Sequence, residues 1–122
     1  MEFRFKREKN LDERKQTGRN LKEKFPDKIP IILEKAPNTK LKEIDKSKFL
    51  VSKELTVANF LLMICKRMEI DPNSAIVLMV KETAKTTRTL TADSCLRDIY
   101  EKYADKEDGF LYIIYTSQWF WG

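Results

Sequence analysis

The chain has 122 residues, of which 42% are hydrophobic and 35% charged, a balance typical of one globular domain. Its net charge of +5 comes from 24 Lys and Arg residues interspersed with 19 acidic ones, a pattern that does not predict a nucleic-acid binder. Histidine is absent, which excludes histidine-based catalytic triads and most zinc sites, so we expect no catalytic residue, no metal site and no enzyme activity.

The first 25 residues favour helix but carry few apolar side chains. We predict a short helix near the start and a longer one from Leu11 to Lys24, which ends where Pro26 restricts the backbone of Phe25. Gly18 is a weak point inside the longer helix. Residues 1–25 are therefore expected to form a helical extension packed on the rest of the domain.

Two strands and a core helix are predicted next. The strands cover residues 28–35, with Pro30 near the start, and 48–52, in which Lys48 and Leu50 share one face. Residues 55–68 have apolar side chains at helical spacing, and Thr56 is the expected N-cap. This helix carries more apolar residues than one buried stripe needs, which predicts an exposed apolar patch on it.

The second half predicts a strand over residues 75–82, a helix over 91–103 with Thr91 or Asp93 as its cap, and a strand over 109–116. A polar, threonine-rich loop is expected at 83–95. This order predicts an α+β fold in which a four-stranded sheet wraps a central helix, after two extra N-terminal helices.

Cys65 and Cys95 lack metal-ligand spacing, and the charged start of the chain does not resemble a signal peptide. We expect both to be reduced thiols in a cytoplasmic protein. Because no apolar run approaches the roughly 20 residues that span a bilayer, membrane association would need surface contact or a covalent anchor.

Four separated segments resemble one family. The stretches FPDKIPIILEKA, EIDKSKFLV, LTVANFLLMICKR and KEDGFLYIIY are similar, in order and spacing, to the autophagy-related protein 8 family of GABARAP-like ubiquitin-like modifiers. The resemblance implies a ubiquitin-like β-grasp at residues 26–115 and a flexible conjugation tail at 116–122.

The resemblance also implies a role for Gly122, the last residue of the sequence. Its carboxylate would pass through activating and conjugating enzymes and be joined to phosphatidylethanolamine, a covalent lipid anchor rather than a cofactor. A cysteine protease would process or deconjugate the protein. Glycine suits this chemistry because it has no Cβ to obstruct a narrow enzyme channel. Alternatively, Trp119 and Trp121 fold back onto the sheet, and the glycine is merely where the sequence stops.

The second implied site binds receptors that carry aromatic-x-x-aliphatic motifs preceded by acids, laid along the edge strand as an additional strand. The residues carried over for the aromatic pocket are Leu21, Pro30, Ile32, Lys48, Leu50 and Phe110. Those for the aliphatic pocket are Phe49, Val51, Leu55, Phe60 and Met63, with Leu62 a further candidate. Lys28 and Arg67 would join Lys48 in contacting the acids. Ordinary core packing is an alternative for Val51, Phe60 and Ile64.

The sequence departs from the family pattern at Thr17, usually a glutamate, at Ser52, often a proline, and in the longer 83–95 loop. Its ending, Trp121 and Gly122, replaces the usual Phe-Gly and resembles autophagy-related protein 12, a modifier joined to a protein lysine. A third hypothesis is a non-conjugated adaptor that binds an acidic partner such as tubulin. The lipid-conjugated modifier, placed in the cytoplasm and on the autophagosomal membrane, is the preferred interpretation.

Overall fold

The computed structural model describes residues 1–74 and 76–117. The elements in chain order are α1 (Arg4–Glu8), α2 (Leu11–Lys24), β1 (Lys28–Lys35), β2 (Lys48–Ser52), α3 (Val57–Met68), β3 (Ile76–Lys81), β4 (Thr87–Thr89), α4 (Leu96–Tyr103) and β5 (Leu111–Ser117). The predicted order of two N-terminal helices before an α+β domain is confirmed.

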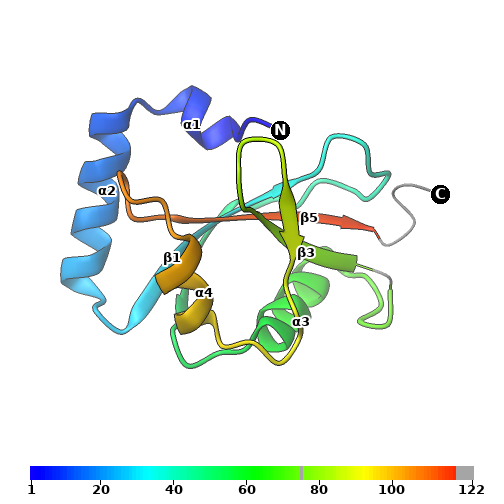
Figure 1. Ribbon diagram of the computed structural model, residues 1–122. Coiled ribbons are helices and arrows are strands. Elements are labelled where there is room, and N and C mark those ends of the chain that lie inside the picture. Colours follow the sequence, from blue (N-terminus) through cyan, green and yellow to red (C-terminus); the bar gives the residue numbers. More distant parts are fainter. Residues whose placement is uncertain (75, 118–122) are drawn as a thin grey trace.

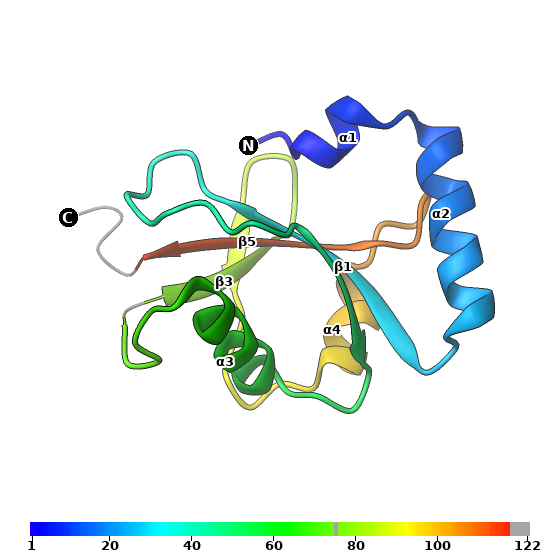
Figure 2. The same ribbon diagram turned by 180° about the vertical axis from the view of Figure 1, so that it is seen from behind.

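The strands form one sheet in the order β2-β1-β5-β3-β4. The central pair, β1 and β5, is parallel, and the other neighbours are antiparallel. Figures 1 and 2 show α3 and α4 against one face of the sheet, with α1 across the opposite face and α2 beside it. This arrangement is the expected ubiquitin-like β-grasp with two N-terminal helices.

The sheet has five strands where the sequence predicted four. The additional strand, β4, lies in the segment expected to be a loop, and it pairs with the end of β3. All three of its residues are exposed. It therefore lacks the alternation of apolar and polar residues by which a half-buried strand is predicted.

Two apolar clusters lie on the two faces of the sheet. The larger one joins residues such as Ile31 and Leu33 of β1 to Phe60 and Ile64 of α3. The smaller one contains Ile32 of β1, Ile114 of β5 and Phe110, which directly precedes β5. Phe3, before α1, and Ala36, after β1, complete it. Because both faces are covered, β1 is a continuous buried run from Ile29 to Leu33.

The predicted start of α3 is confirmed. The Thr56 side chain accepts a hydrogen bond from the Asn59 amide, and the Asn59 side chain accepts one from the Thr56 amide. This reciprocal capping satisfies two amides that the first turn of a helix leaves without partners. The expected apolar patch is also present, because Leu62 and Met63 are 53% and 42% exposed.

The predicted caps of α4 are wrong. The helix begins at Leu96 after Cys95, whose side chain makes no capping bond. The Thr91 hydroxyl instead bonds that of Ser94. The reason is tertiary, since the carbonyls of Ala92 and Ser94 accept the amides of Ala58 and Val57 and so hold this segment along the start of α3.

The C-terminal tail was expected to begin at residue 116, but β5 continues through Ser117. Thr116 is buried and pairs with Val77 of β3, while Ser117 pairs with Ile76. Both residues therefore belong to the sheet. Trp119, Trp121 and Gly122 lie outside the described residues.

Candidate functional site

The predicted aromatic pocket is centred on the β1–β2 pair. β2 is the outermost strand on its side of the sheet. The antiparallel register places Pro30 opposite Leu50 and Ile32 opposite Lys48. Directly opposite residues of an antiparallel pair lie on the same face, so these four predicted residues, from two segments of the chain, lie on one face of the sheet next to its β2 edge, with Pro30 and Ile32 buried there.

The other two predicted residues of this pocket come from outside the pair. Phe110 and Ile32 belong to the smaller apolar cluster, and Leu21 of α2 packs against it. Ile32 and Phe110 have no exposed surface, whereas Leu21 and Leu50 are half-buried and Lys48 is exposed. The structure brings the set together, and its role in peptide binding stays a prediction.

The predicted aliphatic pocket is divided between core and surface. Phe49, Val51 and Phe60 are at most 6% exposed and belong to the larger cluster. The rings of Phe49 and Phe60 meet edge to face with centroids 5.6 Å apart. Leu55 is half-buried and Met63 is exposed. Solvent therefore reaches chiefly Leu55 and Met63, and the three buried residues belong to the core, against which Leu55 packs.

The basic residues predicted to contact acids differ in their surroundings. Lys28 is exposed, with its ammonium 5.8 Å from the centre of the Phe25 ring. The Arg67 guanidinium is already paired, because its Nε and Nη2 donate to the two Asp45 carboxylate oxygens at 2.8 and 3.3 Å. An acidic peptide would have to compete with Asp45 for Arg67.

Phe5 of α1 is a neighbour of the aromatic pocket that the sequence did not predict. Its ring meets the Phe110 ring edge to face, with centroids 5.1 Å apart. The Lys48 ammonium lies 5.8 Å from its centre. Phe5 was visible only as an isolated apolar residue, and nothing local to it indicates a contact with residue 110.

The two substitutions relative to the family pattern have local hydrogen bonds. The Thr17 hydroxyl donates to the Glu13 carbonyl of the preceding turn at 3.0 Å. The Ser52 hydroxyl accepts the Glu54 amide at 3.2 Å, just where β2 ends. Ser52 thus begins a turn through its side chain at a position where a proline would impose one through its ring.

A buried carboxylate fastens α2 to the segment before β5. Asp108 accepts hydrogen bonds from the Phe110 amide at 2.9 Å, the Arg14 Nε at 2.9 Å and the Tyr112 hydroxyl at 2.5 Å. Burial, and then the bond to Asp108, raise the pKa of Tyr112. Burial alone would lower the pKa of Arg14, but its bond to Asp108 and nearby negative charge raise it overall. The raised pKa keeps the Arg14 guanidinium charged beside the buried carboxylate.

Gly18 lies at the same junction. A Cβ built on it would come within 2.2 Å of the Asp108 carbonyl oxygen, which is closer than real Cβ contacts allow. The glycine that the sequence marked as a weak point in the helix is thus required by the close approach of α2 to residue 108.

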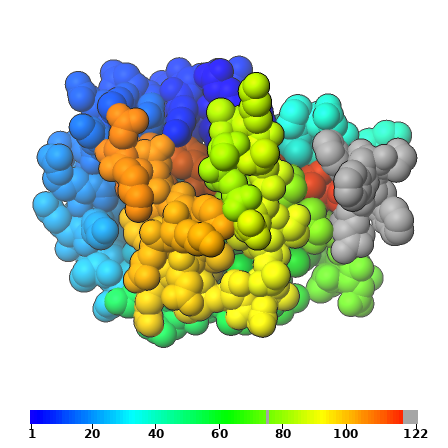
Figure 3. Space-filling view, viewed as in Figure 1, coloured from blue at the N-terminus to red at the C-terminus, as the bar shows by residue number. Residues whose placement is uncertain are grey.

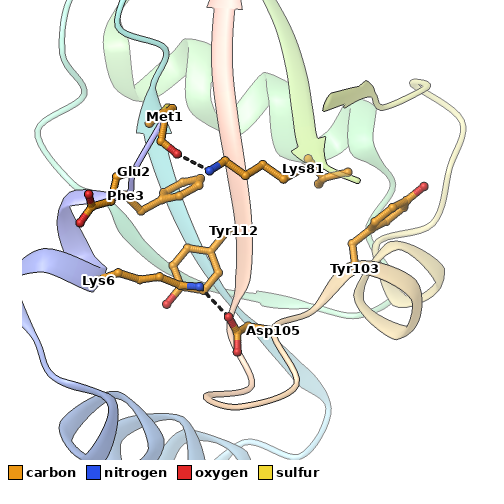
Figure 4. A pocket seen from close by; sticks show the side chains of 9 residues that line it. Met1, Glu2, Phe3, Lys6, Lys81, Tyr103, Asp105 and Tyr112 are labelled. Carbon is orange, nitrogen blue, oxygen red and sulfur yellow. Dashed lines mark hydrogen bonds and ion pairs between the residues drawn. The ribbon is translucent and has the colours of Figure 1, made fainter. Parts of the chain in front are cut away.

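A hollow lies beside β5 and β3, on the other side of β1 from β2. It has a volume of about 480 Å³ and is lined by Met1, Glu2, Phe3, Lys6, Val80, Lys81, Tyr103, Asp105 and Tyr112. Figure 3 shows it between the N-terminal segment, the β3–β4 hairpin and the segment that follows α4. In Figure 4, Lys6 reaches Asp105, and the Lys81 ammonium donates to the Met1 carbonyl. Its charged side chains are thus largely engaged with the chain itself.

Metal and membrane sites were sought over the described ranges, 1–74 and 76–117. They contain no group of three His, Cys, Asp or Glu residues placed to hold a metal ion. No helix within the same ranges has both the length and the apolarity needed to cross a bilayer. Cys65 is buried, Cys95 is half-buried, and both are free thiols; burial raises the pKa of Cys65.

Comparisons of the sequence and of the structure with known proteins indicate the same family. The family model described as "Autophagy protein Atg8 ubiquitin like" matches residues 13–122. The chain is 40% identical to autophagy-related protein 8 of Mycosarcoma maydis over 114 residues, covering 93% of this chain and 92% of the relative. It is 41% identical to autophagy-related protein 8A of Oryza sativa subsp. indica, covering 93% and 91%. The crystal structure of Trypanosoma brucei ATG8 superposes with a TM-score of 0.86 at 33% identity, covering 97% of each chain.

Proposed function

The chain belongs to the Atg8 family of ubiquitin-like autophagy proteins, and from that premise we propose that Gly122 is joined to phosphatidylethanolamine and that the anchored protein recruits receptors. The protein is a ubiquitin-like modifier of autophagy. We propose which residues bind its partners and that phosphatidylethanolamine is the lipid.

Family similarity supports the conjugation step. The matched region extends to residue 122 and so includes Gly122. The Gly122 carboxylate would be adenylated by ATP with release of pyrophosphate, a thiol of the activating enzyme would displace AMP to form a thioester, and a thiol of the conjugating enzyme would then take over the acyl group. Attack by the ethanolamine amine would form an amide and release the enzyme thiol. The two acyl chains of the lipid would hold the domain on a membrane, because each buried methylene contributes about 0.8 kcal/mol.

The partners of this step would be the activating and conjugating enzymes and a cysteine protease that processes the chain or removes the lipid. The protein would be distributed between the cytoplasm and the autophagosomal membrane. On that membrane it would bind receptors and cargo.

The observation that carries the peptide-binding proposal is the β1–β2 register, which places Pro30 opposite Leu50 and Ile32 opposite Lys48 at the outermost strand of the sheet. A peptide added to β2 would form backbone hydrogen bonds. Its aromatic side chain would lie against these residues, and acids before it would face Lys48. Its aliphatic side chain would contact Leu55 and Met63, the solvent-exposed members of the second set.

Changing Gly122 to Ala should abolish membrane attachment and leave peptide affinity unchanged, because residue 122 is not among those predicted to line the peptide site. The measurement is membrane flotation from cells in which autophagy is induced, combined with the mass of the C-terminal peptide. Phosphatidylethanolamine on wild-type Gly122 supports the proposal. A branched peptide on a protein lysine would instead indicate a protein-conjugated modifier, and an unmodified glycine a non-conjugated adaptor.

Changing Leu50 to Ala should weaken binding of an acidic aromatic-x-x-aliphatic peptide about tenfold or more, because the side chain lies at the centre of the edge surface. Leu50 is half-buried, so the variant should stay folded, unlike a change at the core residue Phe49. Val77→Ala, at a half-buried position of β3, is the matched control. Equal affinity of the Leu50 variant and wild type by calorimetry would refute the groove.

A further inference from the structure

The aromatic pocket is covered in the free chain. Ile32 and Phe110 have no exposed surface. A side chain without exposed surface cannot contact an incoming ring, so a group that covers these two residues has to move before a peptide can reach them.

Phe5 is the cover that lies between this cluster and the edge strand. It packs against the cluster that contains Ile32 and Phe110. Its ring centre is 5.1 Å from the ring centre of Phe110 and 5.8 Å from the Lys48 ammonium. Phe5 thus contacts one predicted pocket residue and lies close to another.

The other covers are more firmly held. Tyr112 lies within β5, and its hydroxyl donates to the buried Asp108 carboxylate at 2.5 Å. Leu21 is carried by α2, which the Arg14–Asp108 ion pair and the close approach at Gly18 fix in place. Moving either residue would break buried contacts.

The element that carries Phe5 is held weakly by comparison. α1 has five residues, none of them buried, although its N-cap, Phe3, is buried and its ring meets that of Tyr112 edge to face, with centroids 5.0 Å apart. The amides of Arg4 and Phe5 donate to the Glu34 carboxylate at 2.6 and 3.0 Å, and Lys6 donates to Asp105 at 2.7 Å. Short elements with few buried contacts open at lower free energy than the core does, so α1 can swing away from the sheet about the Phe3 anchor while the sheet stays intact.

We propose that Phe5 is an intramolecular lid on the aromatic pocket, seated by Glu34 and Lys48, which an aromatic-x-x-aliphatic peptide displaces on binding. This inference rests on the proposed peptide-binding function. The fraction of molecules with the lid open then sets the apparent affinity, because a peptide that needs the open form binds more weakly in proportion to that fraction.

The test measures the affinity of an acidic aromatic-x-x-aliphatic peptide for the full chain and its variants. Removing the lid with Phe5→Ala should tighten peptide binding about fivefold. Glu34→Gln, which weakens the hydrogen bonds to the Arg4 and Phe5 amides but keeps the Phe5 ring, should tighten it about twofold. Tyr103→Ala removes a half-buried ring that lines the hollow beside β5 and β3, and we expect unchanged affinity from it. Hydrogen exchange of the Arg4 and Phe5 amides in wild type should accelerate when peptide is bound.

Two outcomes would overturn the lid. Weaker binding of Phe5→Ala would make Phe5 a wall of the pocket, and unchanged protection of both amides in the complex would show that α1 stays in place. Failure of the underlying function looks different, because Leu50→Ala would then bind as well as wild type or wild type would not bind at all. Should Phe5→Ala fail to fold, the exchange measurement on wild type and the Glu34→Gln affinity decide the question.

Discussion

The two faces of the sheet are held together by different means. The face covered by α3 and α4 is a large apolar cluster built around Phe60, Ile64 and Leu96, each without exposed surface. The face covered by α1 and α2 has a small cluster and depends on ion pairs to Asp105 and Asp108. Apolar packing does not depend on the protonation of single groups, whereas the strength of an ion pair does. The α3 face therefore maintains the fold, and the α1 face can change with conditions and ligands.

The sharpest test of this difference is Phe60→Ala. Phe60 is fully buried and packs against Phe49, so truncation should lower the free energy of unfolding by about 3–5 kcal/mol. Chemical denaturation measures it. Met63→Ala, at an exposed position of the same helix, should cost less than about 1 kcal/mol. Similar losses for the two variants would contradict the assignment of this face as the core.

A smaller and more local effect is expected from Asp108→Ala. The change leaves Arg14, whose side chain is 11% exposed, without its ion-pair partner and should cost about 2–4 kcal/mol. Hydrogen exchange should accelerate mainly in α1 and α2. Asp45→Ala, which removes an exposed ion pair with Arg67, should cost less than about 1 kcal/mol. Loss of protection spread evenly over both faces would contradict the separation.

The smallest effect concerns pH and the Lys6–Asp105 pair. Burial would raise the pKa of Asp105, but hydrogen bonds from Lys6 and from two backbone amides lower it overall. A carboxyl group whose pKa is lowered by folding stabilises the protein above its unfolded pKa, and this contribution is lost as the pH falls from about 4 through the folded value.

The exposed Lys6 limits this contribution to less than about 1 kcal/mol. Denaturation of wild type and Asp105→Asn between pH 6 and about 3 should show the difference between the two shrinking as the pH falls. A constant difference across that range would show that the charge of Asp105 has no part in holding α1.

Much of the fold could be predicted because its signals are local. The Thr56 cap, the helix that ends before Phe25 and the apolar runs of β1 and β5 each depend on neighbours in sequence. The family resemblance supplied the pocket residues, and the β1–β2 register brings the central four together.

What the sequence did not predict depends on contacts between distant residues. Arg67 is paired with Asp45, 22 positions away, and Phe5 meets Phe110 across most of the chain. Gly18 looked like a defect because the Asp108 carbonyl that it approaches has no signal near it in the sequence. The β4 strand was missed because its exposed residues give no periodicity.

The two edge strands of the sheet differ in length, and this difference affects how copies of the protein associate at high local concentration. β2 offers five residues at one edge, whereas β4 offers three, Thr87, Arg88 and Thr89, at the other. Strand-to-strand association between copies needs two edges of usable length, and a short, charged edge is a poor template for it. Pairing of two β2 edges would stop at a dimer, because adding a third copy would need a second long edge, so copies concentrated side by side are not expected to extend through β2 into a continuous filament.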